Sequence, residues 1–155
     1  MSSPSLPQKA IKWLLILVTL IMCLIHTEIY KGICPACSNV GNDVKQAVQL
    51  SMIMSILFLF TLVVIPTQNY SSIWTASIIF IFMTIIMGAN AHIYRKMSGN
   101  SCNKQLLKYV GANLGISTSV VSLSLITLII TGLKEKKSGN LTISAIQEKY
   151  MPPKK

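Results

Sequence analysis

Two cysteines separated by two residues form the clearest chemical motif of the sequence, Cys34-Pro35-Ala36-Cys37. This C-x-x-C spacing is typical of thiol-redox pairs when a helix N-terminus lowers the pKa of the first thiol. No strand or helix-start pattern surrounds the motif, and a zinc site would need a second pair, for which only Cys102 and a histidine remain. We therefore expect loop cysteines or a disulfide among Cys34, Cys37 and Cys102, with no cofactor and no metal.

Five polar side chains that could bind a solute or carry protons fall at corresponding ends of three apolar blocks. His26 and Glu28 close the first block, Asn90 and His92 close the third, and Asn113 opens the fourth. Ionisable residues inside a membrane are costly and indicate a site or a pathway. None of the five lies at mid-membrane depth in this interpretation. We therefore expect a polar cluster near the headgroup boundary, where such residues hydrogen-bond between helices.

Small residues recur every four positions in the last apolar block, at Gly111, Gly115 and Ser119. On a helix this spacing forms one stripe, which lets another helix backbone approach closely in lipid. The stripe could pack inside the protein or against a partner. We expect packing inside, because a four-helix bundle needs such contacts.

The elements that must position these residues are four apolar blocks, at about residues 11–30, 47–66, 73–93 and 109–133. Each block is close to the roughly 20 residues that cross a bilayer as a helix. Of the 155 residues 52% are hydrophobic and 12% are charged, against about 25% charged in an average globular chain. The sequence predicts an all-α membrane protein, with a four-transmembrane-helix bundle over 11–133, an N-terminal segment over 1–10 and a basic tail over 134–155.

Basic residues exceed acidic residues by 14 to 4 and lie in the loops and tails that flank the apolar blocks. This distribution is typical of membrane topology and of attraction to anionic headgroups, and not of nucleic-acid binding. Four spans place both termini on one side. Placing the termini in the cytoplasm puts eight of the 14 basic residues inside, which favours that orientation by a small margin. We expect the plasma membrane, with the endoplasmic reticulum as the alternative.

A short stretch around the first loop is similar to a known signature. Gly32-Ile33-Cys34 followed by Cys37 resembles the Gly-Leu-Trp…Cys…Cys signature of the claudin, peripheral myelin protein and epithelial membrane protein superfamily. Residues Val44–Gln49, leading into Met52–Ser55, are similar to that family's entry into its second span. The resemblance implies a tetraspan protein with cytoplasmic termini. The loop over 31–46 is too short for the family's outer β-sheet, so an accessory role is implied rather than a barrier or pore between cells.

These features favour a non-enzymatic tetraspan protein that organises or regulates other membrane proteins. The expected partners are the lipid bilayer, other membrane proteins and a second copy of the chain. Two alternatives come from different classes of protein. One is a thiol-redox membrane enzyme acting through Cys34 and Cys37, and the other is a small channel or transporter subunit using His26, Glu28 and His92.

Overall fold

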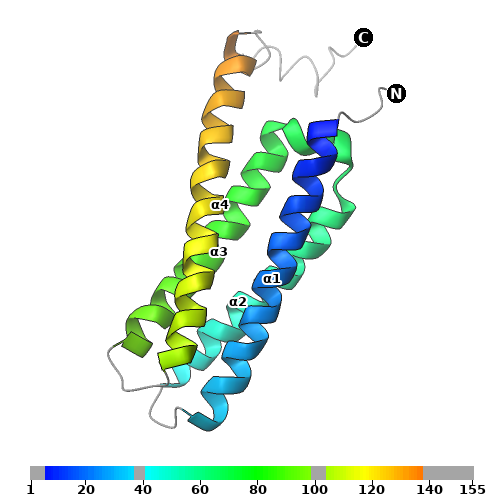
Figure 1. Ribbon diagram of the computed structural model, residues 1–155. Helices are drawn as coiled ribbons and strands as arrows, with labels where there is room; N and C mark the ends of the chain where they lie inside the picture. The colour runs from blue at the N-terminus through cyan, green and yellow to red at the C-terminus, as the bar shows by residue number, and fades with distance from the viewer. Residues whose placement is uncertain (1–5, 37–40, 99–103, 138–155) are drawn as a thin grey trace, which may run out of the picture.

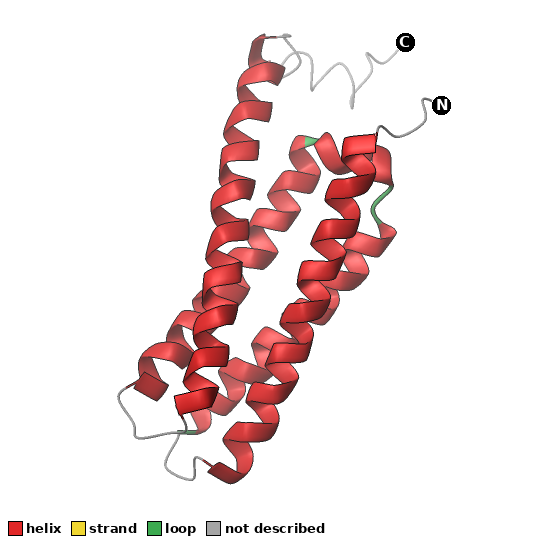
Figure 2. Ribbon diagram, viewed as in Figure 1, coloured by secondary structure: helices red, strands yellow, loops and turns green. Residues whose placement is uncertain are grey.

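The computed structural model describes residues 6–36, 41–98 and 104–137. Four long helices and one short 3-10 helix follow one another along the chain: α1 (Leu6–Ala36), α2 (Asn42–Val64), η1 (Thr67–Ser71), α3 (Ile73–Ser98) and α4 (Lys104–Lys137). The described residues contain no strand (Figure 2). All four long helices are long and apolar enough to cross a membrane. The prediction of an all-α, four-transmembrane-helix protein is confirmed.

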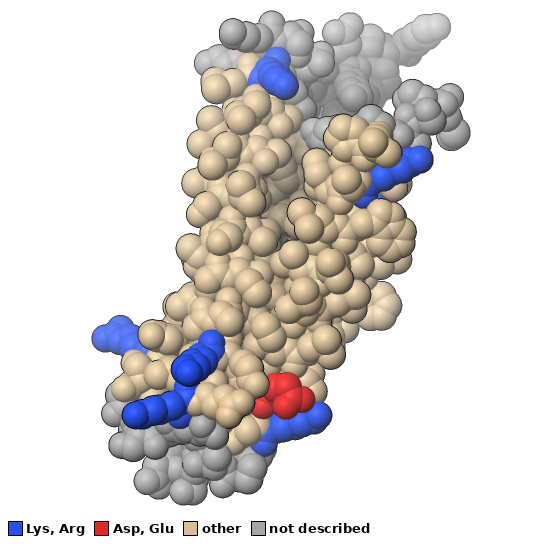
Figure 3. Space-filling model, in the orientation of Figure 1, with Lys and Arg blue, Asp and Glu red and all other residues tan. Residues whose placement is uncertain are grey.

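Successive long helices run in opposite directions (Figure 1). The first turn of α1 and the last turn of α4 therefore lie at one end of the bundle, and the last turns of α1 and α3 and the first turns of α2 and α4 lie at the other. On the face drawn in Figure 3, the described Lys, Arg, Asp and Glu side chains gather near the two ends and leave the middle uncharged. This arrangement suits a bundle that crosses the bilayer along its long axis.

The helices extend beyond the apolar blocks that predicted them. α1 continues to Ala36 instead of residue 30, α2 begins at Asn42 instead of 47, and α3 continues to Ser98 instead of 93. Hydropathy marks the lipid boundary, whereas a helix continues into the headgroup region as long as each residue adds a backbone hydrogen bond. Cys34, predicted in a loop, therefore lies in the last turn of α1. Cys37 and Cys102 lie outside the described residues, and Cys23 is a free cysteine within α1.

The connection between α2 and α3 is held by two side chains that reach the last carbonyl groups of α2. Lys12 on α1 donates from Nζ to the carbonyl oxygens of Val63 at 3.1 Å and Ile65 at 2.9 Å. The hydroxyl of Tyr70 on η1 donates to the carbonyl oxygen of Leu62 at 2.5 Å. Burial raises the pKa of Tyr70 to about 12, so the phenol keeps its proton as a donor. These contacts satisfy carbonyl groups that the end of a helix leaves unpaired.

The buried apolar residues form two clusters, one toward each end of the bundle. The cluster near the α1–α2 and α3–α4 connections contains Ile29, Ile33, Val44, Val48, Ile93, Met97, Leu106 and Val110. The cluster toward the chain termini contains Ile16, Met22, Phe58, Leu62, Tyr70, Ile79, Met83 and Ile86. On α1, α2 and α3 a short stretch of the helix separates the residues of one cluster from those of the other. That interval contains the buried polar residues His26, Ser51, Ser55 and Asn90.

Candidate functional site

A layer of fully buried polar side chains separates the two apolar clusters. It is formed by His26 of α1, Ser51 and Ser55 of α2, Asn90 of α3, and Asn113 and Ser117 of α4. Each of the four transmembrane helices therefore contributes to it. We call this set the polar layer.

His26 is the centre of the hydrogen bonds in the polar layer. Its Nε2 lies 2.6 Å from Ser51 Oγ and 3.1 Å from Asn90 Oδ1, and its Nδ1 lies 3.3 Å from Ser55 Oγ. One imidazole ring thus links α1 to α2 and to α3. Hydrogen bonds between helices stabilise membrane bundles because an unpaired polar group has no water to bind in lipid.

The contact with Asn90 assigns one proton of His26. Asn90 Oδ1 is an amide oxygen that only accepts, so Nε2 of His26 carries a proton and donates to it. Ser51 Oγ lies beside the same nitrogen, and Ser55 Oγ, which donates to the carbonyl oxygen of Ser51 at 2.8 Å, lies beside Nδ1. Both ring nitrogens of His26 therefore contact polar side chains of neighbouring helices.

The α3 and α4 side of the layer is less completely paired. Asn90 Nδ2 and both side-chain atoms of Asn113 are buried and have no hydrogen-bond partner among the described residues. Each such group costs about 1–3 kcal/mol when it is removed from water without a replacement bond. Ser117, one turn further along α4, donates to the backbone carbonyl of Asn113 at 2.8 Å and does not bond the side-chain amide of Asn113. The layer therefore contains unused donors and an unused acceptor.

The structure divides the predicted polar cluster into two groups. Asn90 bonds His26 directly and Asn113 is buried with them, whereas Glu28 and His92 lie on the outer surface. A helix turns by about 100° per residue, so residues two apart point to opposite sides. The prediction that all five residues form one cluster is wrong for Glu28 and His92.

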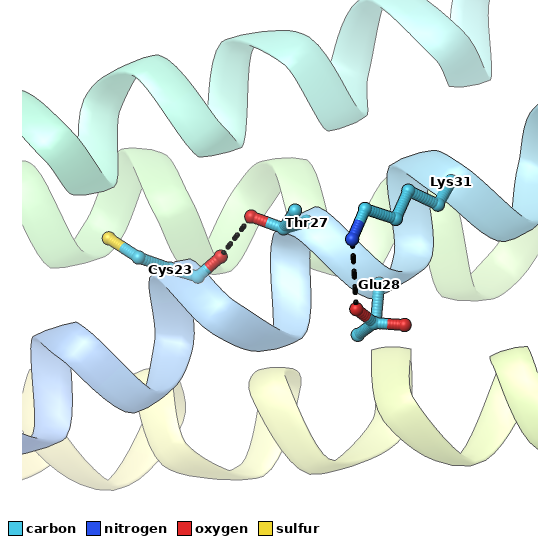
Figure 4. A network of polar contacts seen from close by, with 4 residues as sticks. All are labelled: Cys23, Thr27, Glu28 and Lys31. Atoms are coloured by element: carbon cyan, nitrogen blue, oxygen red, sulfur yellow. Dashed lines mark hydrogen bonds and ion pairs between the residues drawn. The ribbon is translucent and has the colours of Figure 1, made fainter.

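The two excluded residues make polar contacts at the surface instead. Glu28 accepts from Lys31 at 3.4 Å on α1, next to Thr27, whose hydroxyl donates to the Cys23 carbonyl at 2.9 Å (Figure 4). His92 lies 3.4 Å from the Asp43 carboxylate on α2, and Lys96 lies 3.3 Å from the same carboxylate. No group of three or more His, Cys, Asp and Glu side chains in the described ranges could hold a metal ion.

The polar layer lies away from both ends of the bundle. Ser51 and Ser55, which contact His26, lie near the middle of α2 (Asn42–Val64) and not at its end. His26 is ten residues before the end of α1, which is about 15 Å at 1.5 Å per residue. The polar layer therefore lies in the interior of the bundle.

The sequence analysis missed three residues of the layer: Ser51, Ser55 and Ser117. Serine differs little from its surroundings in hydropathy, so a search for costly ionisable residues passes over it. The available signal is spacing, because Ser51 and Ser55, like Asn113 and Ser117, are four residues apart in an apolar helix. That spacing places both members on one helix face.

The small-residue stripe of α4 does not pack inside the bundle as predicted. Gly111 is half-buried, and a Cβ added there would lie 3.5 Å from the Tyr94 ring. Gly115 and Ser119 are exposed, and a Cβ added at Gly115 would meet no atom within 4 Å. The periodicity correctly indicates one helix face, but for Gly115 and Ser119 that face points outward. A close internal approach occurs instead at Gly32 of α1, where an added Cβ would collide with the Leu106 side chain of α4.

Comparison with known protein families, with curated proteins and with solved structures finds no match to this chain. Two features stand out in the described residues. One is the buried polar layer around His26, and the other is the outward face of α4 near Gly115.

Proposed function

We propose that this protein is a non-enzymatic tetraspan membrane protein that organises or regulates other membrane proteins through the outer face of α4. The observation that carries the proposal is a set of small, exposed residues on that helix: Gly115, Thr118, Ser119 and Ser122. We call this set the small-residue face. Its members fall within an arc of about 100° at 3.6 residues per turn, on the side of α4 opposite the buried Val110, Asn113 and Ser117.

The hydroxyl groups of the small-residue face are already satisfied by their own helix. Thr118 donates to the Leu114 carbonyl at 2.7 Å, Ser119 to Gly115 at 2.9 Å and Ser122 to Thr118 at 2.9 Å. The face is therefore smooth and free of polar groups that need water. Such a surface lets a second helix approach closely, and close packing of small residues drives helix association in lipid.

Most of the second half of α4 is not covered by the rest of the chain. Between residues 118 and 133 only Ser124 is buried, and α4 stands apart from α1 toward the terminal end of the bundle (Figure 1). Its 34 residues span about 51 Å, more than the roughly 30 Å of a bilayer core. Apolar surface alone is satisfied by lipid, so the small residues carry the argument for a protein partner. The resemblance of the first-loop region to the claudin superfamily supports the same role.

The test is recovery of a membrane partner after photo-crosslinking of the full-length protein in its native membrane. Thr118→Ile and Gly115→Ile add bulk to the small-residue face, whereas Thr127→Ile makes a matched change on another side of α4. Thr118 and Thr127 are both exposed, and each donates to the carbonyl four residues earlier.

We expect the wild type and Thr127→Ile to recover the same partner, and Gly115→Ile and Thr118→Ile to lose it at least tenfold. The mass of the crosslinked product shows whether the partner is a second copy or a different membrane protein. Equal recovery with all four proteins, or a monomer in every sample, would contradict the proposal.

A further inference from the structure

The amide of Asn113 is a fully buried polar group of α4 that is not bonded to the rest of the polar layer. His26 connects α1 directly to α2 and α3. Asn113 Nδ2 and Oδ1 have no hydrogen-bond partner in the described part of the chain, and neither has Asn90 Nδ2. The polar layer therefore links three of its four helices and leaves the fourth unlinked.

The contacts of α4 with α3 place the two asparagines at nearly the same height. Gly111 of α4 lies against Tyr94 of α3, with 3.5 Å between an added Cβ and the ring. The two helices are antiparallel, so moving from this contact toward the chain termini gives Asn113 after two residues and Asn90 after four. These steps correspond to about 3 Å and 6 Å along the helix axes. Along the helix axes the two asparagines thus lie within one helical turn of each other.

The contact of α4 with α1 gives the same result for His26. Gly32 of α1 and Leu106 of α4 are in close contact. From there His26 is six residues away along α1 and Asn113 is seven residues away along α4, about 9 Å and 10 Å in the same direction. Two independent helix contacts therefore place Asn113 at the level of the polar layer, which it would complete.

The unpaired atoms determine which kind of ligand can bind to Asn90 and Asn113. Two of them are N–H₂ donors and one is a carbonyl acceptor. A bare cation would face two donors, and an anion would leave the acceptor unpaired. A water molecule accepts from N–H groups and donates to a carbonyl oxygen, and buried waters characteristically bind about three otherwise unpaired polar groups.

We infer that the amides of Asn90 and Asn113 bind an internal water molecule that joins α4 to the histidine-centred layer in the interior of the membrane. This site is separate from the outward small-residue face of α4, and the two can be tested independently. The bound water completes a hydrogen-bonded layer across all four helices.

The direct test is NMR of the full-length protein in nanodiscs, with ¹⁵N in the asparagine side chains. Asn90→Leu and Asn113→Leu assign the two resonances, and the exposed Asn69 gives the reference for contact with bulk water. We expect magnetisation to be transferred by dipolar coupling from a long-lived bound water to the side-chain amide protons of Asn90 and Asn113. Absence of transfer at both in the wild type, or a direct amide-to-amide contact that excludes water, would overturn the inference.

A measurement of thermal stability tests the inference independently, because a bound water and a dry site predict changes of opposite sign in the melting temperature. If water links the amides, Asn113→Leu displaces it and leaves Asn90 Nδ2 unpaired, so the melting temperature falls. If the amides are dry, the same change removes two unpaired buried atoms, and the melting temperature rises. Asn69→Leu on the exposed connection is the control for a general effect of leucine. An unchanged or higher melting temperature for Asn113→Leu would contradict the inference.

Discussion

Ser51 Oγ on α2 lies 2.6 Å from Nε2 of His26 on α1, and both residues are fully buried in the interior of the bundle. This contact joins two helices in the interior of the bundle, away from bulk water. Together with the bonds to Ser55 and Asn90, it makes His26 the residue that fixes the relative height of α1, α2 and α3.

We expect His26→Leu to lower the free energy of unfolding by about 2–4 kcal/mol, because the change leaves Ser51 and Asn90 as buried groups without their partner. Thermal unfolding in detergent, followed by circular dichroism, measures the effect. His92→Leu is the matched control, because the His92 side chain is 45% exposed. A loss as large for His92→Leu as for His26→Leu would show that the internal hydrogen bonds are not the cause.

Lys12→Met should destabilise the terminal end of the bundle by about 1–2 kcal/mol. The side chain donates to the carbonyl oxygens of Val63 and Ile65. Its positive charge also interacts favourably with the negative end of the α2 dipole. Methionine keeps the apolar stem and removes the charge. Lys9→Met, at an exposed position of the same helix, is expected to change the melting temperature little. Equal effects of the two changes would argue against a specific role for Lys12.

Gly32→Val should impair folding, whereas Gly88→Val should not. A Cβ at Gly32 collides with the side chain of the buried Leu106, so that side chain must repack or α1 and α4 must move apart, at a cost of about 1–3 kcal/mol. A Cβ at Gly88 meets no atom within 4 Å, and removing a glycine from a helix is otherwise favourable. The yield of monodisperse protein and its melting temperature compare the two variants. Similar values for both would show that α1 and α4 do not approach closely at Gly32.

The ionisation of Tyr70 should make stability depend on pH only in strongly alkaline solution. Burial raises its pKa from 10.0 to about 12, so between these values the folded chain keeps a proton that the unfolded chain releases. The contribution is complete below pH 10 and is lost as the pH rises through about 12. Absorbance at 295 nm should show one late-ionising tyrosine, which is absent in Tyr70→Phe. Identical titration curves for the two proteins would contradict the buried environment.

The orientation of the bundle can be tested with the sequon at Asn140, which lies outside the described residues. With the termini in the cytoplasm, as proposed from the charge distribution, Asn140 stays without a glycan. Glycosidase treatment of the wild type and of Asn140→Gln measures this directly. A mobility shift that Asn140→Gln abolishes would reverse the orientation.

The apolar blocks were enough to predict the four membrane helices. A helix in lipid satisfies its own backbone hydrogen bonds, so a long apolar stretch becomes a helix whatever its neighbours are. The exact ends were not predictable in this way, because α1 continues as a helix through residues 31–36, past the end of its apolar block.

The tertiary structure decided which polar residues act together. Counting along the sequence grouped His26 with Glu28 and Asn90 with His92, but the rotation of about 100° per residue sends the second of each pair to the surface. The tertiary structure also placed Ser51 and Ser55 beside His26, although neither serine stands out in a hydropathy profile. Likewise, the spacing of Gly115 and Ser119 established a common face, while the position of α4 determined that this face points outward. Periodicity is a property of one helix, whereas burial depends on where the other three helices pack.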